Sequence, residues 1–259
     1  MAEDRRHRLL GFHAVSAALS RAPRQVRSLV VAQEAKNPRL APLLETARTH
    51  GVAVQRRPRV ELDRLSGGER HQDLIAEFTP DNLFAERDLE KLLAESRTSP
   101  LVLILDGVQD PHNLGACLRS AEAAGVDFVV IPKDRAAPLS ATARRAAAGA
   151  AELLPILIAT NLARVLRQLK QAGVWLAGTA DAAQQSLYET DLTGPLGLVM
   201  GGEGQGMRRL TEETCDYLVR IPMLGSVESL NVSTATAVCL FEIRRQNMAR
   251  DAAEAVSRS

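Results

Sequence analysis

The stretch of sequence that decides the fold runs Leu101-Val-Leu-Ile-Leu-Asp106-Gly-Val-Gln-Asp-Pro-His-Asn113-Leu-Gly-Ala-Cys-Leu-Arg119. Its first five residues are all apolar, which predicts a buried strand, and residues 114–124 have the apolar spacing of an amphipathic helix. The same alternation repeats through the rest of the chain. Continuous apolar strands separated by helices are typical of a parallel sheet with helices on both faces. We therefore expect an α/β domain over residues 100–259.

Further strands and helices are predicted on the carboxyl side of this stretch. Apolar runs indicate strands at 128–131, 153–158, 174–177, 196–200 and 217–221, and helical spacing indicates helices at 141–151, 161–172 and 231–250. Thr160 and Asn161 are candidate caps for the second of these helices. The last helix carries apolar residues around much of its circumference, which predicts burial against both the sheet and a second copy of the chain.

The amino-terminal part of the chain predicts a smaller α/β domain. Strand-like runs occur at 26–32, 52–55 and 74–78, and residues 38–50 have helical spacing. A turn signal follows at 79–82, and the charged segment after it ends at Pro100. We therefore predict a domain at 1–80, a partly helical linker at 81–99 and a second domain at 100–259.

The net charge of +1 hides an uneven distribution along the chain. Residues 1–80 carry 14 of the 32 Lys and Arg residues but only 9 of the 31 Asp and Glu residues. Arginine dominates this part, as in the cluster Arg56, Arg57 and Arg59. Arginine binds phosphate in a bidentate manner, so the small domain is a candidate RNA-binding domain. A charge run is also common on a plain solvated surface, and charge alone does not decide between the two.

Composition restricts the class of protein. The 259 residues are 46% hydrophobic and 24% charged, as in soluble globular proteins. Three cysteines cannot all pair and lack metal-like spacing, which suits a reducing compartment and predicts no metal site. No apolar run is long enough to span a bilayer, and the first residues lack the apolar core of a signal peptide. We expect a cytoplasmic protein without a membrane partner.

Three segments carry the candidate chemistry: 113–119, 198–207 and 221–235. Each adjoins the carboxyl end of a predicted strand, where parallel sheets bind their ligands. The glycine-rich segment Gly201-Gly-Glu203-Gly-Gln-Gly206 has neither the spacing of a dinucleotide fingerprint nor the Gly-Lys-Ser/Thr of a P-loop. An oxidoreductase of the dinucleotide-binding type is therefore disfavoured.

These segments together resemble the SpoU/TrmH methyltransferases of the SPOUT superfamily. The resemblance also includes Asp106-Gly-Val-Gln-Asp-Pro-His-Asn-Leu-Gly115, Ile131-Pro-Lys-Asp-Arg135, Gly178-Thr-Ala180 and, in the small domain, Leu10-Gly-Phe-His-Ala-Val15. It implies a carboxyl-terminal domain with a deep trefoil knot, an amino-terminal domain like ribosomal protein L30 that binds RNA, and a homodimer. The implied activity is methyl transfer from S-adenosylmethionine to the ribose 2′-hydroxyl of a guanosine in 23S ribosomal RNA.

The resemblance assigns roles to individual residues. The residues that it implies for the cofactor are Thr179, Met200, Gly201, Gly202, Ile221, Met223 and Leu230, and those that it implies for catalysis are Asn113, Arg119, Glu203, Ser229 and Asn231. Arg119 is implied in activating the 2′-hydroxyl, but a protein arginine keeps its proton, so anchoring of a phosphate and stabilisation of alkoxide charge is an alternative. Glu203 either orients Arg119 or accepts a proton. Asn113 is expected to cap the helix that follows it.

Two other functions remain open at this stage. The first is methylation of another RNA, such as transfer RNA, by the same catalytic domain. The second is a non-catalytic RNA-binding or ribosome-assembly protein built on a degenerate methyltransferase fold. The presence of Asn113, Arg119, Glu203 and Asn231 argues against degeneracy.

Overall fold

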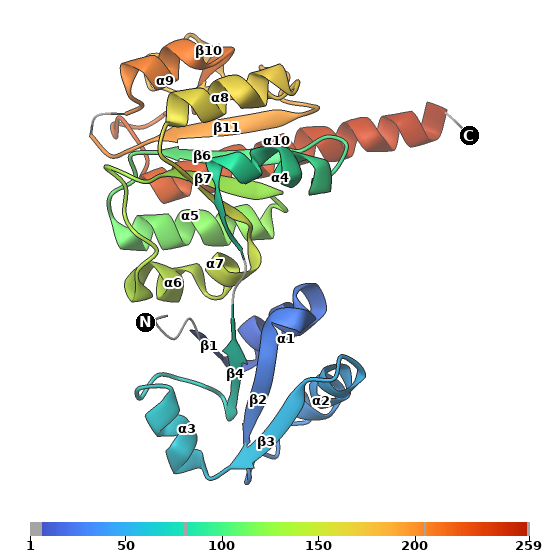
Figure 1. Cartoon of the computed structure of the whole chain (residues 1–259). Coiled ribbons are helices and arrows are strands. Elements are labelled where there is room, and N and C mark those ends of the chain that lie inside the picture. The colour runs from blue at the N-terminus through green and yellow to red at the C-terminus, as the bar shows by residue number, and fades with distance from the viewer. Residues whose placement is uncertain (1–6, 80–81, 205, 258–259) are drawn as a thin grey trace. The chain divides into compact units, whose positions relative to one another are not determined.

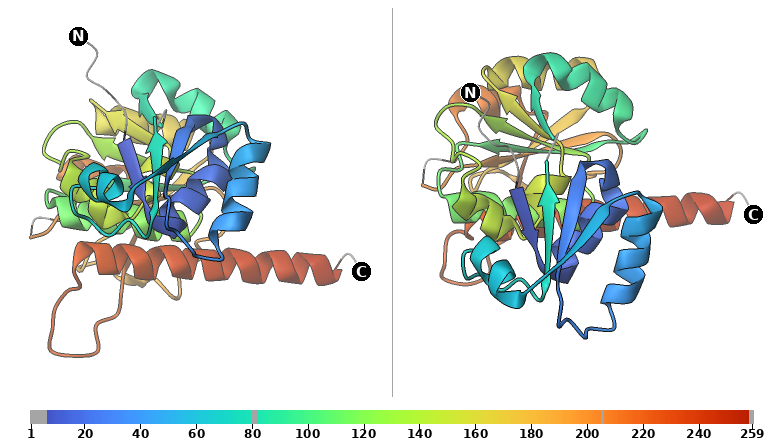
Figure 2. Two further views of the ribbon diagram at one scale, coloured as in Figure 1. Left: turned by 90° about the horizontal axis from the view of Figure 1, so that it is seen from below. Right: turned by 60° about the horizontal axis from the view of Figure 1, so that its bottom comes forward.

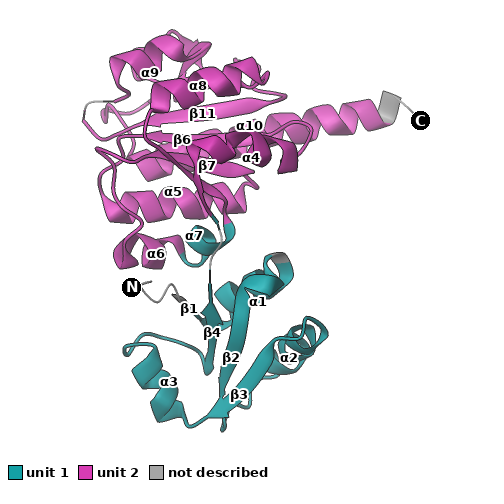
Figure 3. Ribbon diagram, viewed as in Figure 1, with its two compact units in different colours: residues 1–82, 148–153 teal, residues 83–147, 154–259 magenta. Residues whose placement is uncertain are grey.

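The computed structural model describes residues 7–79, 82–204 and 206–257 (Figure 1). The chain forms two compact units, the first made of residues 1–82 with 148–153 and the second of residues 83–147 with 154–259 (Figure 3). In the second unit, residues 83–95 form a strand, a 3₁₀ turn and a helix, although they lie in the segment predicted as a linker. The division into two domains and a linker stays a prediction.

The second unit is built on a sheet of eight strands in the order β10-β12-β9-β11-β6-β7-β8-β5. Every neighbouring pair is parallel, which confirms the predicted α/β fold with a parallel sheet. The strands are β5 (Leu83–Ala85), β6 (Leu101–Asp106), β7 (Phe128–Pro132), β8 (Ile156–Ala159), β9 (Trp175–Thr179), β10 (Gln185–Ser186), β11 (Leu196–Gly201) and β12 (Tyr217–Arg220).

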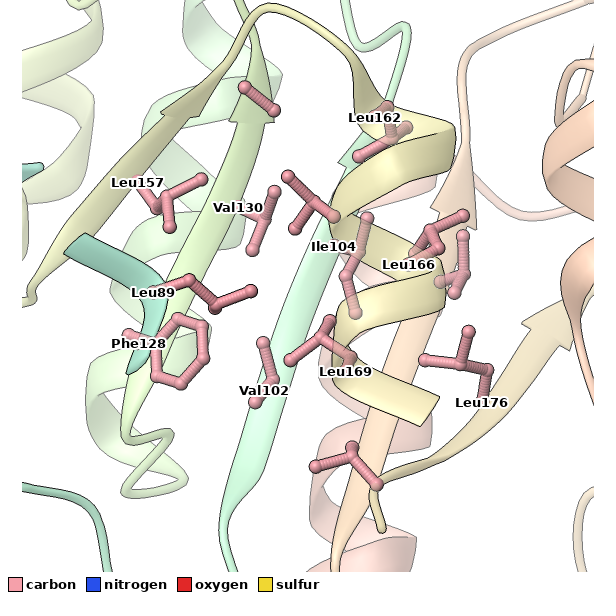
Figure 4. Close-up of a cluster of buried hydrophobic side chains, with 14 of the residues drawn as sticks. Leu89, Val102, Ile104, Phe128, Val130, Leu157, Leu162, Leu166, Leu169 and Leu176 are labelled. Atoms are coloured by element: carbon pink, nitrogen blue, oxygen red, sulfur yellow. The ribbon is translucent and has the colours of Figure 1, made fainter. Parts of the chain in front are cut away.

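One face of this sheet is covered by α4 (Leu89–Glu95) and α8 (Leu162–Gln171) (Figures 1 and 4). Val102 and Ile104 of β6 pack with Leu166 and Leu169 of α8 in this core. Asn161 caps α8, because its side chain accepts a hydrogen bond from the N–H of Arg164, which confirms the predicted cap. The apolar side of this amphipathic helix therefore covers the centre of the sheet.

The helices α5 (Pro111–Ala123) and α10 (Val232–Ser257) pack against each other, and α10 also packs on β11. In Figures 1 and 2, α10 extends past the other elements of its unit. Two further helices belong to this unit, α6 (Ala141–Ala147) and α9 (Arg209–Thr214). Across the described ranges, none of the helices has both the length and the apolar character that a membrane span requires.

The prediction of one continuous helix at 141–151 is wrong. The observed helix α6 ends at Ala147, and a separate short helix, α7 (Ala150–Leu153), begins after Gly149. Ala148 and Gly149 adopt φ angles of 51° and 96°, in the left-handed region that an α-helix does not use. Helical spacing alone does not report such a break, because alanine is compatible with both sides of it.

The first unit is a four-stranded sheet in the order β1-β4-β2-β3. Its elements are β1 (His7–Leu10), α1 (Gly11–Arg21), η1 (Pro23–Gln25), β2 (Val26–Ala32), α2 (Leu40–Thr49), β3 (Ala53–Arg57), α3 (Arg59–Leu65) and β4 (Leu74–Phe78). Alternate residues of β2 serve two cores: Leu29 and Val31 pack with α1 and α2, whereas Val30 and Ala32 pack with α3. The strands at 26–32 and 74–78 are where the sequence predicted them, whereas β1, α1 and α3 were not predicted.

Candidate active site

Four neighbouring strands bring the candidate residues to one edge of the sheet. In the order β12-β9-β11-β6 all strands are parallel, so the segments that follow Arg220, Thr179, Gly201 and Asp106 leave the sheet on the same side. Gly201 and Asp106 are paired in register at this edge. Parallel strands thereby assemble a site from stretches that are far apart in sequence.

A cavity of about 450 Å³ lies at this edge. Its lining includes all seven residues predicted for a cofactor: Thr179, Met200, Gly201, Gly202, Ile221, Met223 and Leu230. Three residues predicted for catalysis, Glu203, Ser229 and Asn231, also line it. A volume of this size and a mixture of apolar side chains with backbone groups are typical of pockets for small organic ligands.

The wall formed by Gly201–Gly206 tolerates no side chain at its first two positions. A Cβ atom on Gly201 would lie 2.3 Å from the backbone of Gly206 and Met207, and one on Gly202 would lie 2.2 Å from the carbonyl oxygen of Gly107. The turn closes on itself through a hydrogen bond from the N–H of Gly206 to the carbonyl of Gly202, 3.1 Å long. Glycine is therefore required here for close backbone approach.

A chain of side-chain hydrogen bonds joins the three distant segments. Asn231 Oδ1 accepts hydrogen bonds from the backbone N–H of Ser233, at 3.0 Å, and from its hydroxyl, at 2.6 Å. Asn231 Nδ2 then donates to Asn113 Oδ1 at 3.0 Å, and Asn113 Nδ2 donates to Glu203 Oε1. Because a backbone N–H can only donate, the polarity of every following bond is fixed, and Glu203 is the acceptor at the end of the chain.

Asn113 does not cap the helix, contrary to the prediction. The N-cap of α5 is Asp110, whose side chain accepts a hydrogen bond from the N–H of His112, and Pro111 occupies the first turn. Asn113 lies within that first turn, where its side chain bonds to Glu203 and Asn231 instead. The sequence signal that was overlooked is Pro111, because proline is common at the first position after an N-cap and therefore favours Asp110.

Arg119 does not line the cavity. It is exposed on α5, six residues after Asn113, which corresponds to about 9 Å along a helix axis. Among the described residues, it has no side-chain hydrogen bond or ion pair with another residue. Its guanidinium group is therefore available to a ligand from outside this unit.

Eight of the described lining residues were not predicted, among them the charged residues Asp181 and Arg220. Asp181 is exposed and lines the cavity two residues after Thr179, beyond the end of β9. Its carboxylate could accept hydrogen bonds from hydroxyl or amino groups of a ligand. Its position just after a predicted strand is the signal that could have identified it. The resemblance assigned a role at this strand end only to Thr179.

The other candidate residues lie outside this cavity. Arg56 and Arg57 are exposed on β3, at the edge of the four-stranded sheet, and Arg59 begins α3. Arg57 lies 3.8 Å from Glu61, and Arg59 lies 3.5 Å from Asp73, distances typical of weak surface ion pairs. No group of three or more His, Cys, Asp and Glu side chains within the described ranges is arranged to hold a metal ion.

The cysteines are poor nucleophiles in this structure. Burial raises the pKa of Cys117 to about 11 and the pKa of Cys215 and of Cys239 to about 12. Each side chain therefore stays a thiol at neutral pH, and none lines the cavity.

Comparison with known sequences finds a family match for each part of the chain. Residues 100–241 match the SpoU rRNA Methylase family, and residues 8–84 match the family described as RNA 2′-O ribose methyltransferase substrate binding. The chain belongs to the SpoU rRNA methylase family. This finding confirms the resemblance inferred from the sequence.

Individual members of the family match nearly the whole chain. The 23S rRNA (guanosine-2′-O-)-methyltransferase RlmB of Pseudomonas aeruginosa is 53% identical over 239 residues, covering 92% of this chain and 96% of that protein. The RlmB enzyme of Escherichia coli K12 is 52% identical over 238 residues, covering 92% and 98%. The crystal structure of the SpoU methyltransferase AviRb from Streptomyces viridochromogenes in complex with AdoMet superimposes with a TM-score of 0.72 at 25% identity, covering 93% and 90%.

Proposed function

We propose that this SpoU-family protein transfers a methyl group from S-adenosylmethionine to the ribose 2′-hydroxyl of a guanosine in 23S ribosomal RNA. The observation that carries the proposal is the cavity at the sheet edge with the Asn231–Asn113–Glu203 hydrogen-bond chain beside it. Identity above 50% over almost the whole chain to enzymes named for this reaction supports the choice of substrate. We also propose a cytoplasmic location, where such a substrate would be met.

The cavity residues fit S-adenosylmethionine. Ile221, Met223 and Leu230 offer apolar contact to an adenine ring and a thioether, and the bare backbone at Gly201 and Gly202 allows close approach. When bound, this cofactor would supply a methyl group attached to a positively charged sulfur, which leaves as a neutral thioether when an oxygen nucleophile bonds to the methyl carbon. The protein must then align the ribose hydroxyl and relieve it of its proton.

Arg119 and Glu203 divide these tasks. Arg119 stays charged, so it anchors a phosphate next to the target ribose and offsets the negative charge that develops on the 2′-oxygen. Glu203, held in place by Asn113, is the carboxylate that either accepts the proton or orients its neighbours around the 2′-hydroxyl. Asn231 and Ser229 position the substrate at the rim of the cavity.

The test of this function uses the full-length chain with labelled S-adenosylmethionine. An unmodified 23S ribosomal RNA transcript should gain one 2′-O-methyl group at one guanosine, whereas a transfer RNA transcript should gain none. Calorimetry should show binding of S-adenosylmethionine or S-adenosylhomocysteine and none of NAD. Methylation of the transfer RNA alone would assign another substrate, and cofactor binding without transfer to either RNA would indicate a binding protein.

The small unit supplies affinity for RNA in this proposal. Changing Arg56, Arg57 and Arg59 together to glutamine should lower the affinity for 23S ribosomal RNA about tenfold to a hundredfold at low salt and flatten its salt dependence, because phosphate contacts release counterions. Filter binding at several salt concentrations measures both quantities. Binding of S-adenosylhomocysteine should stay unchanged, and an unaltered salt slope would exclude these arginines from the RNA contact.

We also infer that the protein is a homodimer. Phe241 and Met248 of α10 are 52% and 65% exposed and lie seven residues apart, on one side of the helix. A second copy that packs on α10 would remove this apolar surface from water. Sedimentation should give a dimer at micromolar concentration, and Phe241→Asp should shift it toward monomer. A wild-type monomer under the same conditions would contradict the inference.

A further inference from the structure

A second cavity, of about 420 Å³, lies on the other side of the glycine-rich turn. Gly202, Glu203 and Gly206 line this cavity as well as the first one, so the turn is a wall between the two. The remaining lining is dominated by polar and charged side chains: Asp106, Gln109, Arg135, Arg208 and Arg209. Of the residues that line this second cavity, only those of the glycine-rich turn have a role in the proposed reaction.

Arg208 is fixed in this cavity by a buried acid. Its Nε lies 2.6 Å from Asp106 Oδ1, and its backbone N–H donates to Asp106 Oδ2 at 2.9 Å. The Asp106 side chain is fully buried, whereas that of Arg208 is 42% exposed. A guanidinium group has five N–H donors, so Arg208 retains donors for a ligand while Asp106 holds its position.

Two other arginines add charge that no buried acid neutralises. Arg135 is exposed and, among the described residues, has no side-chain hydrogen bond or ion pair. Its loop is held by a 2.8 Å hydrogen bond from the N–H of Ala137 to the carbonyl of Val108. In the described part of the chain, the one ion pair of Arg209 is with Glu213, at 3.6 Å, and both side chains are exposed, so the pair contributes little.

We propose that this cavity binds a phosphodiester group of the substrate RNA, with Arg135 and Arg209 as its contacts and Arg208 as an anchored third donor. The inference rests on the proposed function. A ribose at Glu203 carries a phosphate on each side, so a neighbouring phosphate lies within one nucleotide of the wall that the two cavities share. A guanidinium group can donate to two phosphate oxygens at once, which suits three arginines in one cavity to this ligand. The carboxylate of the cofactor is the other anion of the reaction, and the test distinguishes it from a phosphate.

The test compares Arg135→Gln, Arg209→Gln and their double variant with Arg167→Gln. Arg167 is exposed on α8, outside both cavities, and its substitution makes the same change in net charge as each single variant. Each lost phosphate contact should raise the apparent KM for the 23S ribosomal RNA transcript about tenfold and lower the salt slope of RNA binding by about 1, with kcat much less affected. The affinity for S-adenosylhomocysteine should match that of the wild type, which also shows that the site is folded.

Three outcomes separate the possibilities. Variants at 135 and 209 that are indistinguishable from Arg167→Gln in KM and salt slope would overturn the inference. A fall in cofactor affinity with an unchanged salt slope would also overturn it, because the cavity would then hold the cofactor carboxylate. If the wild type methylates no RNA, the proposed function fails, whereas the salt slope of RNA binding still decides whether Arg135 and Arg209 contact phosphate.

Discussion

Replacing Arg119 with alanine is expected to abolish most methyl transfer while leaving cofactor binding unchanged. Arg119 is exposed, lies outside the cavity and has no side-chain partner among the described residues, so its removal should disturb neither the fold nor the pocket. Loss of one charged donor to the transition state costs about 3–4 kcal/mol of barrier, which corresponds to roughly a hundredfold to a thousandfold in rate. Single-turnover methylation of 23S ribosomal RNA measures this loss directly.

The lysine variant and a matched control sharpen this test. Arg119→Lys should recover little activity, because an ammonium group cannot reproduce the planar pair of donors that grips a phosphate. Arg167→Ala, an exposed arginine on another helix, should methylate at the wild-type rate. A wild-type single-turnover rate for Arg119→Ala would remove this residue from the mechanism.

The position of the site could be predicted because it follows from strand polarity. Gly201, Ile221 and Thr179 each lie at or just beyond the end of a parallel strand, and the carboxyl ends of parallel strands share one edge. Apolar runs of five or six residues locate such strands well. Strand polarity therefore predicts where the site lies, whereas the predicted lining residues came from the family resemblance, and other lining residues, such as Asp181 and Arg220, were omitted.

Contacts within the site could not be predicted in the same way. The Asn113–Glu203 and Asn113–Asn231 bonds join residues 90 and 118 positions apart, and nothing local in the sequence determines which amide meets which acid. The helix cap was misplaced at Asn113 for a different, local reason, because the helix begins at Pro111 and Asp110 is the residue that precedes it. The second cavity is formed by the Gly201–Gly206 turn together with a loop after β7, so no single stretch of sequence predicts it. The knot implied by the family resemblance stays a prediction.

Exchanging donor and acceptor in the Asn113–Glu203 hydrogen bond is expected to show whether Glu203 orients its neighbours or accepts the proton of the 2′-hydroxyl. Asn113→Asp alone places a second carboxylate against Glu203 and removes the donor that Glu203 accepts from. Loss of a hydrogen bond to a charged group together with like-charge repulsion costs about 2–3 kcal/mol, so methyl transfer should fall roughly thirtyfold to a hundredfold. Asn231 Nδ2 still finds an acceptor in the carboxylate introduced at position 113, so the rest of the chain of hydrogen bonds is kept.

The double variant Asn113→Asp with Glu203→Gln restores the bond with donor and acceptor exchanged. If Glu203 only orients its neighbours, this variant should recover most of the activity lost in Asn113→Asp, because the glutamine amide donates to the aspartate. If Glu203 receives the proton of the 2′-hydroxyl, the double variant should stay as inactive as Glu203→Gln alone, since an amide is not a base at neutral pH. Equal S-adenosylhomocysteine affinity in all three variants shows that the pocket is intact. Wild-type rates in both single variants would contradict any role for this hydrogen-bond chain in catalysis.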